Sequence, residues 1–236
     1  MRNKSKYLGI NQPIPYKVLE EVVFYLLKGQ VMSKEHIIRH LQEYIKGENR
    51  IGKAYNHINT IIASTENIIL NTRKHITSES YFKLSNEDRL AMIICLISLT
   101  FPVTYEILNV LASGFKVQSK INKAYINQKL MASYGSNRGI YNAIGAVLPM
   151  LVEYGILNRY KIGVYELATQ KEIQNDYLNE MYAYADIKLS ESKSILLDDI
   201  DHRPWYLYFK IHIGKNQNIG LIKYTESRIG HGYLMV

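Results

Sequence analysis

A cluster of polar side chains follows the Tyr134–Gly135 dipeptide at spacings that suit one helix face. Its members are Asn137, Arg138, Tyr141 and Asn142. Residues three and four positions apart are neighbours on a helix, so Arg138, Tyr141 and Asn142 would lie on the same side. Arginine can bond guanine through two hydrogen bonds and asparagine can bond adenine in the same way, each pairing discriminating by about 1–3 kcal/mol. The pattern predicts a helix that reads base edges in duplex DNA.

The residues around this cluster are strongly basic. Between Lys116 and Lys161 there are seven basic residues and one acidic residue, a net charge of +6, and the whole chain carries +8. Such a balance favours a polyanionic partner, with a merely solvated basic surface as the alternative. Phosphate contacts give affinity and salt dependence without sequence information. The residues that we expect to contact phosphates are Lys120, Lys123, Lys129, Arg159 and Lys161.

A helix-turn-helix could position these side chains, because it supplies a supporting helix, a tight turn and a second helix that enters the major groove. Residues 124–133 predict the supporting helix. Tyr134 and Gly135 predict the turn, since glycine adopts a positive φ without steric cost. Ser136 is the expected N-cap of the second helix, where it would also lie against the DNA. Apolar residues at helical spacing then continue until Gly155.

A β-hairpin is expected directly after the second helix. Residues 156–159 and 164–167 predict its two strands, and residues 160–163 its turn. Arg159 and Lys161 would then lie near the hairpin tip. Helix, turn, helix and hairpin together predict a winged helix over about residues 117–168, a module that binds DNA in some proteins and other proteins elsewhere.

Two glycines and a proline inside the second helix oppose this interpretation. Gly139 and Gly145 each cost roughly 1 kcal/mol relative to alanine in a helix. We expect Gly139 to permit close approach of a DNA backbone and Gly145 that of a neighbouring helix. Pro149 removes a helix hydrogen bond, so the helix is expected to bend near Val147 and to leave its DNA-facing first half intact.

The N-terminal residues 1–84 predict a basic helical domain. Helices are expected from Pro15 to about Leu27, from an N-cap at Ser33 to Gly47, over residues 51–63, and in a short segment over 65–72. Residues 1–75 carry twelve basic and six acidic side chains, a net +6. These helices are either a second DNA-contacting module or an ordinary bundle with a basic face.

Residues 85–170 predict central helices followed by the winged helix. Ser85 is a good N-cap, and the run from Leu90 to Val103 is hydrophobic nearly all round, as in a buried helix. Its 14 residues are too few to span a bilayer. Pro102 interrupts the run, and another helix is expected over 103–112.

Residues 171–236 predict a small α+β extension. A helix is expected over 171–186, and aromatic and β-branched residues over 204–224 predict a β-hairpin around a Gly-Lys-Asn-Gln-Asn turn. Residues 226–236 could add one more strand. This part carries eight basic and nine acidic residues, a net −1.

Motifs for catalysis are absent from the chain. It lacks the phosphate-binding loop, the dinucleotide-binding glycines, the nucleophile elbow and the paired zinc histidines. The acidic group Asp198, Asp199 and Asp201, with His202 and Lys210, weakly suggests a metal-dependent nuclease, although Tyr208 stands where such a site needs an acid. A solvated loop or a helix cap is the simpler interpretation. The seven histidines show no convincing ligand pair, so we expect no catalytic residue, cofactor or metal.

The composition favours an intracellular protein. Cys95 is the only cysteine, so an intrachain disulfide is impossible. The basic N-terminus lacks the apolar core of a secretory signal. We therefore expect a cytoplasmic protein without a membrane-spanning segment.

The order of these segments resembles that of BrxA proteins from bacteriophage-exclusion (BREX) systems. The similarity covers about residues 16–167 and rests on two stretches, LTFPVTYEILNVLASG and YINQKLMASYGSNRGIYNAIGAVLPMLVEYGILNR, with FPV and YGIL as landmarks. The resemblance implies a basic, non-enzymatic DNA-binding protein with a helical N-terminal part and a winged helix. It does not account for the chain after Lys171.

Together these observations predict a mainly α-helical protein: an N-terminal helical bundle, a winged helix-turn-helix and a small α+β tail. The expected function is non-catalytic binding of double-stranded DNA, in phage defence, in a mobile element or in regulation, with other defence-system proteins as possible further partners. The alternative is an adaptor that uses its winged helix for protein–protein contacts.

Overall fold

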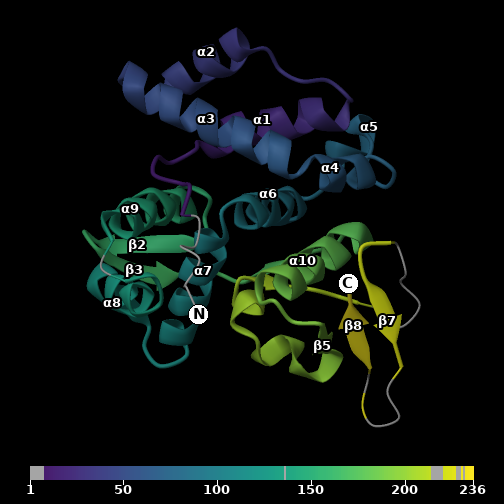
Figure 1. The fold of residues 1–236 in the computed structure, drawn as a ribbon. Helices are drawn as coiled ribbons and strands as arrows, with labels where there is room; N and C mark the ends of the chain where they lie inside the picture. Colours follow the sequence, from purple (N-terminus) through teal and green to yellow (C-terminus); the bar gives the residue numbers. More distant parts are fainter. Residues whose placement is uncertain (1–7, 136, 214–219, 227–229, 231) are drawn as a thin grey trace.

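The computed structural model describes residues 8–135, 137–213, 220–226, 230 and 232–236. The chain is mainly helical with small sheets, as expected from the sequence. Helix α6 (Asn86–Thr100) lies at the centre of Figure 1, with the N-terminal helices above it. In Figure 1, helices α8 (Lys123–Tyr134) and α9 (Arg138–Glu153) lie with strands β2 (Leu157–Lys161) and β3 (Val164–Leu167) to the left of α6, whereas α10 (Asp176–Leu189) lies with the C-terminal strands below it and to the right.

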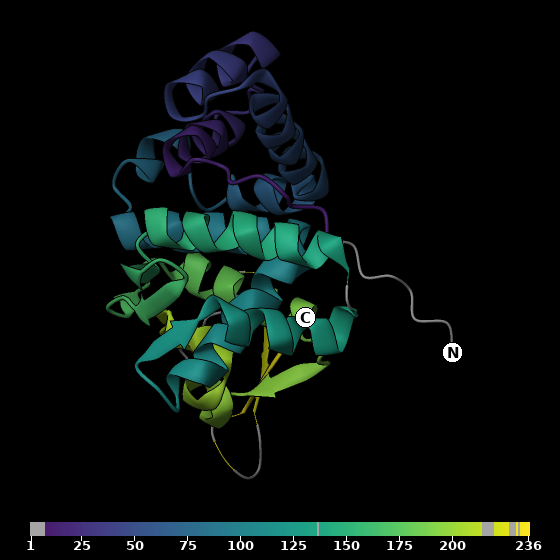
Figure 2. The same cartoon turned by 90° about the vertical axis from the view of Figure 1, so that its left-hand side faces the viewer.

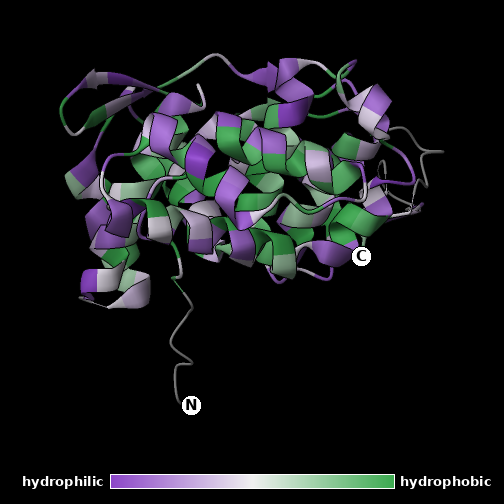
Figure 3. Cartoon of the chain, turned by 90° about the horizontal axis from the view of Figure 1, so that it is seen from above, coloured by the Kyte–Doolittle hydropathy of each residue, from purple (hydrophilic) through white to green (hydrophobic). Residues whose placement is uncertain are grey.

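The N-terminal helices follow the predicted order. Their bounds are α1 Tyr16–Leu27, α2 Lys34–Tyr44, α3 Glu48–Ser64, α4 Glu66–Thr72 and α5 Ser78–Tyr81. Ser33 caps α2, since its hydroxyl accepts a hydrogen bond from the His36 amide at 3.2 Å. Figure 3, viewed from the side of these helices, shows hydrophilic and hydrophobic residues alternating along them. The pattern is that of helices that bury one face and expose the other.

Two apolar helices form the centre of the core. The Ser85 hydroxyl accepts from the Asp88 amide at 3.0 Å and begins α6, in which every residue from Leu90 to Ser98 is buried. Pro102 begins α7 (Pro102–Phe115), and the two helix axes differ by 115°. Among the described residues, no single helix is long and apolar enough to cross a membrane. Helices α6 and α7 taken together have the necessary length and composition, but they are bent by 115°.

The predicted supporting helix, second helix and hairpin are all present. After α7 the chain forms β1 (Lys120–Asn122), α8 (Lys123–Tyr134), α9 (Arg138–Glu153), β2 (Leu157–Lys161) and β3 (Val164–Leu167). The three strands form an antiparallel sheet in the order β1-β3-β2. The hairpin turn is shorter than expected, because Lys161 already pairs with Val164.

Helix α9 begins and continues differently from the prediction. Its N-cap is Asn137 and not Ser136, because the Asn137 Oδ1 accepts from the Gly139 amide at 2.8 Å. Ser136 lies outside the described residues. Helical structure continues without interruption through Pro149 to Glu153, and Figure 2 shows α9 as one ribbon across the molecule. Proline has no N–H, so the carbonyl of Gly145, four residues before Pro149, lacks its usual helix hydrogen bond. Gly145 and Pro149 are both partly exposed, so water can bond to this carbonyl.

The C-terminal part departs most from the prediction. Its helix, α10 (Asp176–Leu189), begins five residues later than residue 171, because Lys171–Glu172 instead forms β4, which pairs in parallel with β6 (Phe209–Lys210). The predicted hairpin over 204–224 is wrong. Strand β7 (Lys223–Thr225) pairs with β8 (Tyr233–Met235), which also pairs with β5 (Ser194–Leu196). The expected Gly-Lys-Asn-Gln-Asn turn falls within residues 214–218, which lie outside the described ranges.

Burial of aromatic side chains explains this difference. The segment between β5 and β6 forms two 3-10 helices, Leu197–His202 and Pro204–Leu207. Trp205 is fully buried and stacks on Tyr182 of α10, with ring centroids 4.7 Å apart. The Trp205 indole N–H donates to the Tyr182 carbonyl, and the Tyr182 hydroxyl donates to the Trp205 carbonyl. Aromatic residues that suit a strand are used here to fix α10 in the core.

A candidate nucleic-acid interface

The polar cluster on α9 is exposed as predicted. Arg138, Tyr141 and Asn142 all lie on the outer side of the helix, and 41% of Tyr141 is accessible to solvent. The Tyr141 hydroxyl donates to the Met131 Sδ of α8 at 2.8 Å and so ties the two helices together. The neighbouring positions Ile140 and Ala143 are fully buried, and this burial fixes which side of α9 faces outward.

Asn137 is exposed too, but its chemistry differs from that of Asn142. Its Oδ1 is occupied by the cap hydrogen bond to the Gly139 amide. Recognition of adenine by asparagine needs both the carbonyl oxygen and the amide group. Asn142, whose side chain makes no hydrogen bond within the described residues, keeps both groups available.

Lys123 joins α9 to the hairpin. Its backbone N–H donates to the Gly163 carbonyl in the hairpin turn at 2.8 Å. Its Nζ lies 3.9 Å from the point where a Cβ on Gly145 would stand, over the same outer stripe of α9 that carries Arg138 and Asn142. Lys123 at the start of α8 therefore lies between the hairpin turn and the middle of α9.

The hairpin presents two cations on the strand that leads into an apolar tip. Arg159 and Lys161 on β2 are exposed, and so are Tyr160 at 54% and Ile162 at 96%. Gly163 has a φ of +74°, which completes the two-residue turn after Ile162. The expectation that Arg159 and Lys161 lie close to the tip therefore agrees with the geometry.

Two of the predicted phosphate contacts, Lys120 and Lys129, differ from the others in their surroundings. Lys120 Nζ is 3.5 Å from the Glu166 carboxylate and 3.2 Å from the centroid of the Tyr160 ring, so its charge is partly neutralised. Lys129 lies next to Tyr125 on the side of α8 that faces α7, in a groove with Asn109. Lys123, Arg138, Arg159 and Lys161 remain, and none of them makes an ion pair within the described part of the chain.

The two helix glycines do not have the predicted roles. A Cβ on Gly139 would stand 2.9 Å from the Leu8 Cδ1, so Gly139 faces the chain's own N-terminal segment. Around Gly145 the nearest group is the Lys123 ammonium, and no neighbouring helix approaches it closely. The glycine that does permit close packing is Gly114 in α7, where a Cβ would stand 2.5 Å from the Ile121 Cδ1.

The segment from Leu8 to Gln12 connects α9 with the N-terminal helices, a contact that the sequence did not predict. Beyond Leu8, the Asn11 N–H donates to the His57 Nε2 of α3 at 3.2 Å, and the Arg50 Nε donates to the Gln12 Oε1 at 3.3 Å. Burial, followed by the nearby Lys53 ammonium, lowers the pKa of His57 from 6.5 to about 4. His57 therefore stays neutral and accepts this hydrogen bond at neutral pH.

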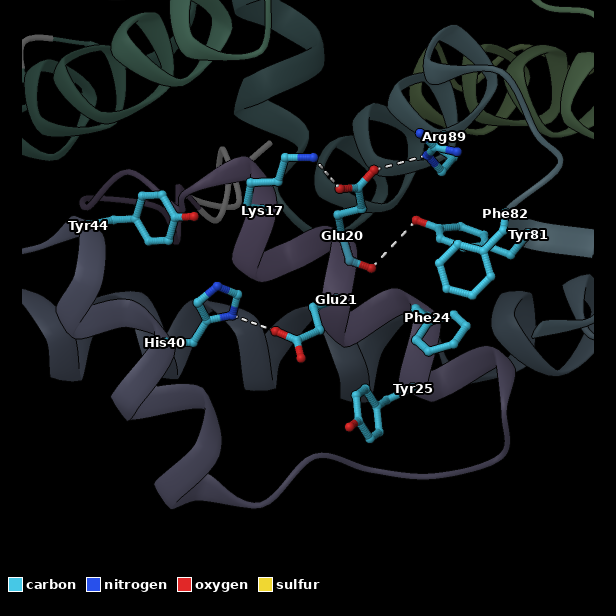
Figure 4. A pocket seen from close by; sticks show the side chains of 10 residues that line it. All are labelled: Lys17, Glu20, Glu21, Phe24, Tyr25, His40, Tyr44, Tyr81, Phe82 and Arg89. Carbon is cyan, nitrogen blue, oxygen red and sulfur yellow. Dashed lines mark hydrogen bonds and ion pairs between the residues drawn. The ribbon is translucent and has the colours of Figure 1, made fainter. Parts of the chain in front are cut away.

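A groove of about 680 Å³ lies on the N-terminal helices, apart from the α9 surface (Figure 4). It is lined by aromatic and charged side chains of α1, α2, α5 and α6 and of the residue that follows α5. These are Lys17, Glu20, Glu21, Phe24, Tyr25, His40, Tyr44, Tyr81, Phe82 and Arg89. Concavity together with charged groups makes this groove the main alternative site.

The charges in this groove are already paired. Glu20 lies 2.9 Å from the Lys17 Nζ and 3.0 Å from the Arg89 Nε. Glu21 lies 2.5 Å from the His40 Nδ1 and 3.6 Å from the His36 Nε2. His36 and His40 lie four residues apart on one face of α2, a pairing that was not expected from the sequence. Glu20 and Glu21 therefore both have basic partners within the protein.

The acidic group of the nuclease hypothesis lies at the surface. Asp198, Asp199, Asp201 and His202 are exposed on the first 3-10 helix, and Lys210 is exposed on β6. Among the described residues, no group of three or more histidine, cysteine, aspartate or glutamate side chains could hold a metal ion. No side chains in this part of the described chain therefore gather into a metal-dependent catalytic site.

Comparisons with protein-family models, with curated proteins and with solved structures return no significant match.

Proposed function

We propose that this protein binds double-stranded DNA, without catalysis, through a winged helix formed by α7, β1, α8, α9, β2 and β3. The observation that carries the proposal is that Lys123 on α8, Arg138 on α9, and Arg159 and Lys161 on the hairpin are exposed or partly exposed and make no ion pair within the described residues. The succession of helix, strand, two helices and hairpin, with the sheet order β1-β3-β2, supports a winged helix. In this proposal α9 enters the major groove and the hairpin contacts the neighbouring backbone.

The exposed side chains have distinct proposed roles. Arg138 and Asn142 contact base edges, since both project from the first turns of α9 with free hydrogen-bonding groups. Lys123, Arg159 and Lys161 contact phosphates. Tyr141 positions α9 on α8 and covers a sugar or base beside the helix. Asn137 orients the helix start as its cap, and Lys120 and Lys129 contribute only to the long-range positive field.

We also propose that this DNA binding serves a phage-defence system of the BREX type, a mobile element or a regulatory circuit, together with other proteins of that system. The support is the resemblance of residues 16–167 to BrxA proteins, at the FPV and YGIL landmarks. Genes for a DNA methyltransferase and an ATPase next to the coding gene would favour the defence role.

Fluorescence anisotropy with a labelled duplex tests the DNA-binding proposal. Arg138→Ala should lower affinity by about tenfold or more, since a lost bidentate base contact costs roughly 1–3 kcal/mol. Lys161→Ala should weaken binding to all sequences and reduce the slope of log affinity against log salt by about 0.9. Lys83→Ala, an exposed lysine beside the groove on the N-terminal helices, is the matched control and should leave both quantities unchanged.

Unchanged duplex affinity in both surface variants would remove α9 and the hairpin from the binding site. Absence of any duplex binding at moderate salt, together with a stable protein partner recovered in a pull-down, would instead support the adaptor alternative.

A further inference from the structure

The tip of the β2–β3 hairpin carries an apolar side chain with almost no protein contacts. Ile162 is 96% exposed, more than any other large hydrophobic residue in the described chain, and Tyr160 on the same hairpin is 54% exposed. The turn does not require isoleucine, because the positive φ that it needs is supplied by Gly163 at +74°. Folding therefore gives no reason for an isoleucine at this position.

The position of the tip is fixed relative to α9. The Lys123 N–H holds the Gly163 carbonyl at 2.8 Å, and the Lys123 ammonium lies over Gly145 on the outer stripe of α9. Antiparallel pairing of Lys161 with Val164 closes the hairpin directly behind Ile162. A duplex held by α9 therefore meets this side chain in one defined place.

The charge around Ile162 indicates which partner it meets. Lys161 precedes it, Arg159 lies on the same strand, and Lys123 lies behind the turn, all exposed or partly exposed and without an ion pair in the described residues. An apolar protein groove would have to accept these cations together with the isoleucine. Phosphates lining a DNA groove match the cations, and stacked bases between them offer an apolar surface for the isoleucine.

We propose that Ile162 acts as a wedge that enters the minor groove next to α9, partly separates two base pairs and bends the duplex. The proposal deepens the DNA-binding function proposed above and rests on it. The minor groove is only about 6 Å wide, so it admits a two-residue turn and one side chain more readily than a helix. Apolar wedges at such steps kink DNA by roughly 20–90°. The protein then selects flexible pyrimidine–purine steps under its wing without hydrogen bonds to those bases.

Energy transfer between dyes at the two ends of a short duplex tests the wedge. The wild-type protein should bring the ends closer, and 2-aminopurine placed at the step under the wing should brighten as it unstacks. Ile162→Ser should abolish both signals while lowering affinity by no more than about tenfold, since the phosphate contacts remain. Ile162→Leu should retain both signals. Val117→Ser is the matched control, because Val117 is 87% exposed but lies before β1, away from the hairpin turn.

The outcomes separate the two proposals. Duplex binding that depends on Arg138 but leaves the DNA straight, or bending that survives Ile162→Ser, would overturn the wedge and leave DNA binding intact. Lack of duplex binding by the wild-type protein would overturn both. If Ile162→Ser instead abolished a complex with another protein and left DNA bending unchanged, the tip would be a protein contact and the wedge would be wrong.

Discussion

The groove on the N-terminal helices and the surface formed by α9 with the hairpin differ in how their charges are paired. In the groove, Glu20 and Glu21 lie within 3.6 Å or less of four cationic or titratable partners, and each charge is satisfied inside the protein. On the α9 surface, Arg138 and Lys161 are exposed and make no ion pair with any residue that the structure describes. The groove is concave, yet the cations that make no ion pair among the described residues lie on the α9 surface.

If the proposed function is right, concavity alone is a poor guide to the binding site of this basic protein. Paired charges in a partly buried groove hold helices together, whereas unpaired charges on an open surface are available to a polyanion. A duplex is a large cylinder with a phosphate about every 1.7 Å of its axis, and it needs an exposed row of cations more than a pocket. Substitutions in the groove should therefore change stability without changing DNA binding, and substitutions on the α9 surface should do the reverse.

Glu20→Ala should show the largest effect on stability. The change leaves Arg89 and Lys17 without their carboxylate and removes the acceptor for the Tyr16 hydroxyl, which lies 3.2 Å away. Hydrogen bonds to charged groups contribute about 1.5–3 kcal/mol each, so the free energy of unfolding should fall by about 2 kcal/mol after allowance for the partly exposed site. Urea unfolding measures this loss, and anisotropy should show unchanged affinity for a duplex.

Glu35→Ala is the control for this substitution, since Glu35 is an exposed carboxylate in the first turn of α2 and should change stability by only a few tenths of a kcal/mol. A Glu20→Ala protein that folds as stably as the wild type but binds DNA less well would reverse the comparison between the two regions.

Acidification should act through His57, which connects the N-terminal helices with the segment that touches α9. Its pKa is lowered to about 4 in the folded protein against 6.5 in the unfolded chain, mainly by burial. The unfolded state then binds more protons at pH 5, so stability is full above pH 6.5 and is lost as the pH falls toward 4. Between pH 7 and pH 5 the loss from this residue alone should be about 2 kcal/mol.

His57→Gln separates this contribution from that of other titrating groups. Glutamine keeps an acceptor for the Asn11 N–H but does not titrate, so the variant should lose less stability over the same pH interval. Unfolding curves recorded at several pH values measure the difference. Equal pH dependence in the two proteins would mean that His57 becomes protonated without penalty in the folded state.

The elements with strong local signals could be predicted from the sequence. Ser33 and Ser85 cap α2 and α6 because a hydroxyl just before an apolar helical pattern satisfies the first free amides. The two helices and the hairpin around the Tyr134–Gly135 turn also follow from local signals, namely apolar residues at helical spacing and turn glycines. Each of these features depends on residues close together in the chain.

Features that depend on distant residues could not be predicted. Lys120 was expected to contact phosphate, but Glu166, across the sheet and outside the basic segment, lies against it. Trp205 favours a strand by local preference, yet stacking on Tyr182 places it in a 3-10 helix. The approach of Leu8 to Gly139 has no local signal at all. In the candidate interface, the exposed side of α9 was predictable, whereas the subset of lysines that share it was not.

The smallest expected effect concerns two glycines inside helices, one in the N-terminal helices and one in α9. A Cβ on Gly52 of α3 would meet nothing within 4 Å, and a Cβ on Gly145 of α9 would meet only the Lys123 Nζ at 3.9 Å. Alanine is better than glycine in a helix by about 1 kcal/mol, so Gly52→Ala and Gly145→Ala should each raise the free energy of unfolding by up to that amount.

DNA binding should distinguish the two glycine variants even though their stabilities rise together. Gly145 lies on the same stripe of α9 as Arg138 and Asn142, two turns further from the helix start, so an added methyl group would stand between that stripe and a bound duplex. We expect Gly145→Ala to weaken binding by up to about threefold and Gly52→Ala to leave it unchanged. If both variants bind as well as the wild type, the contact with DNA ends before Gly145 and is confined to the first two turns of α9 and the hairpin. That outcome would narrow the reading surface on α9 to Arg138, Tyr141 and Asn142.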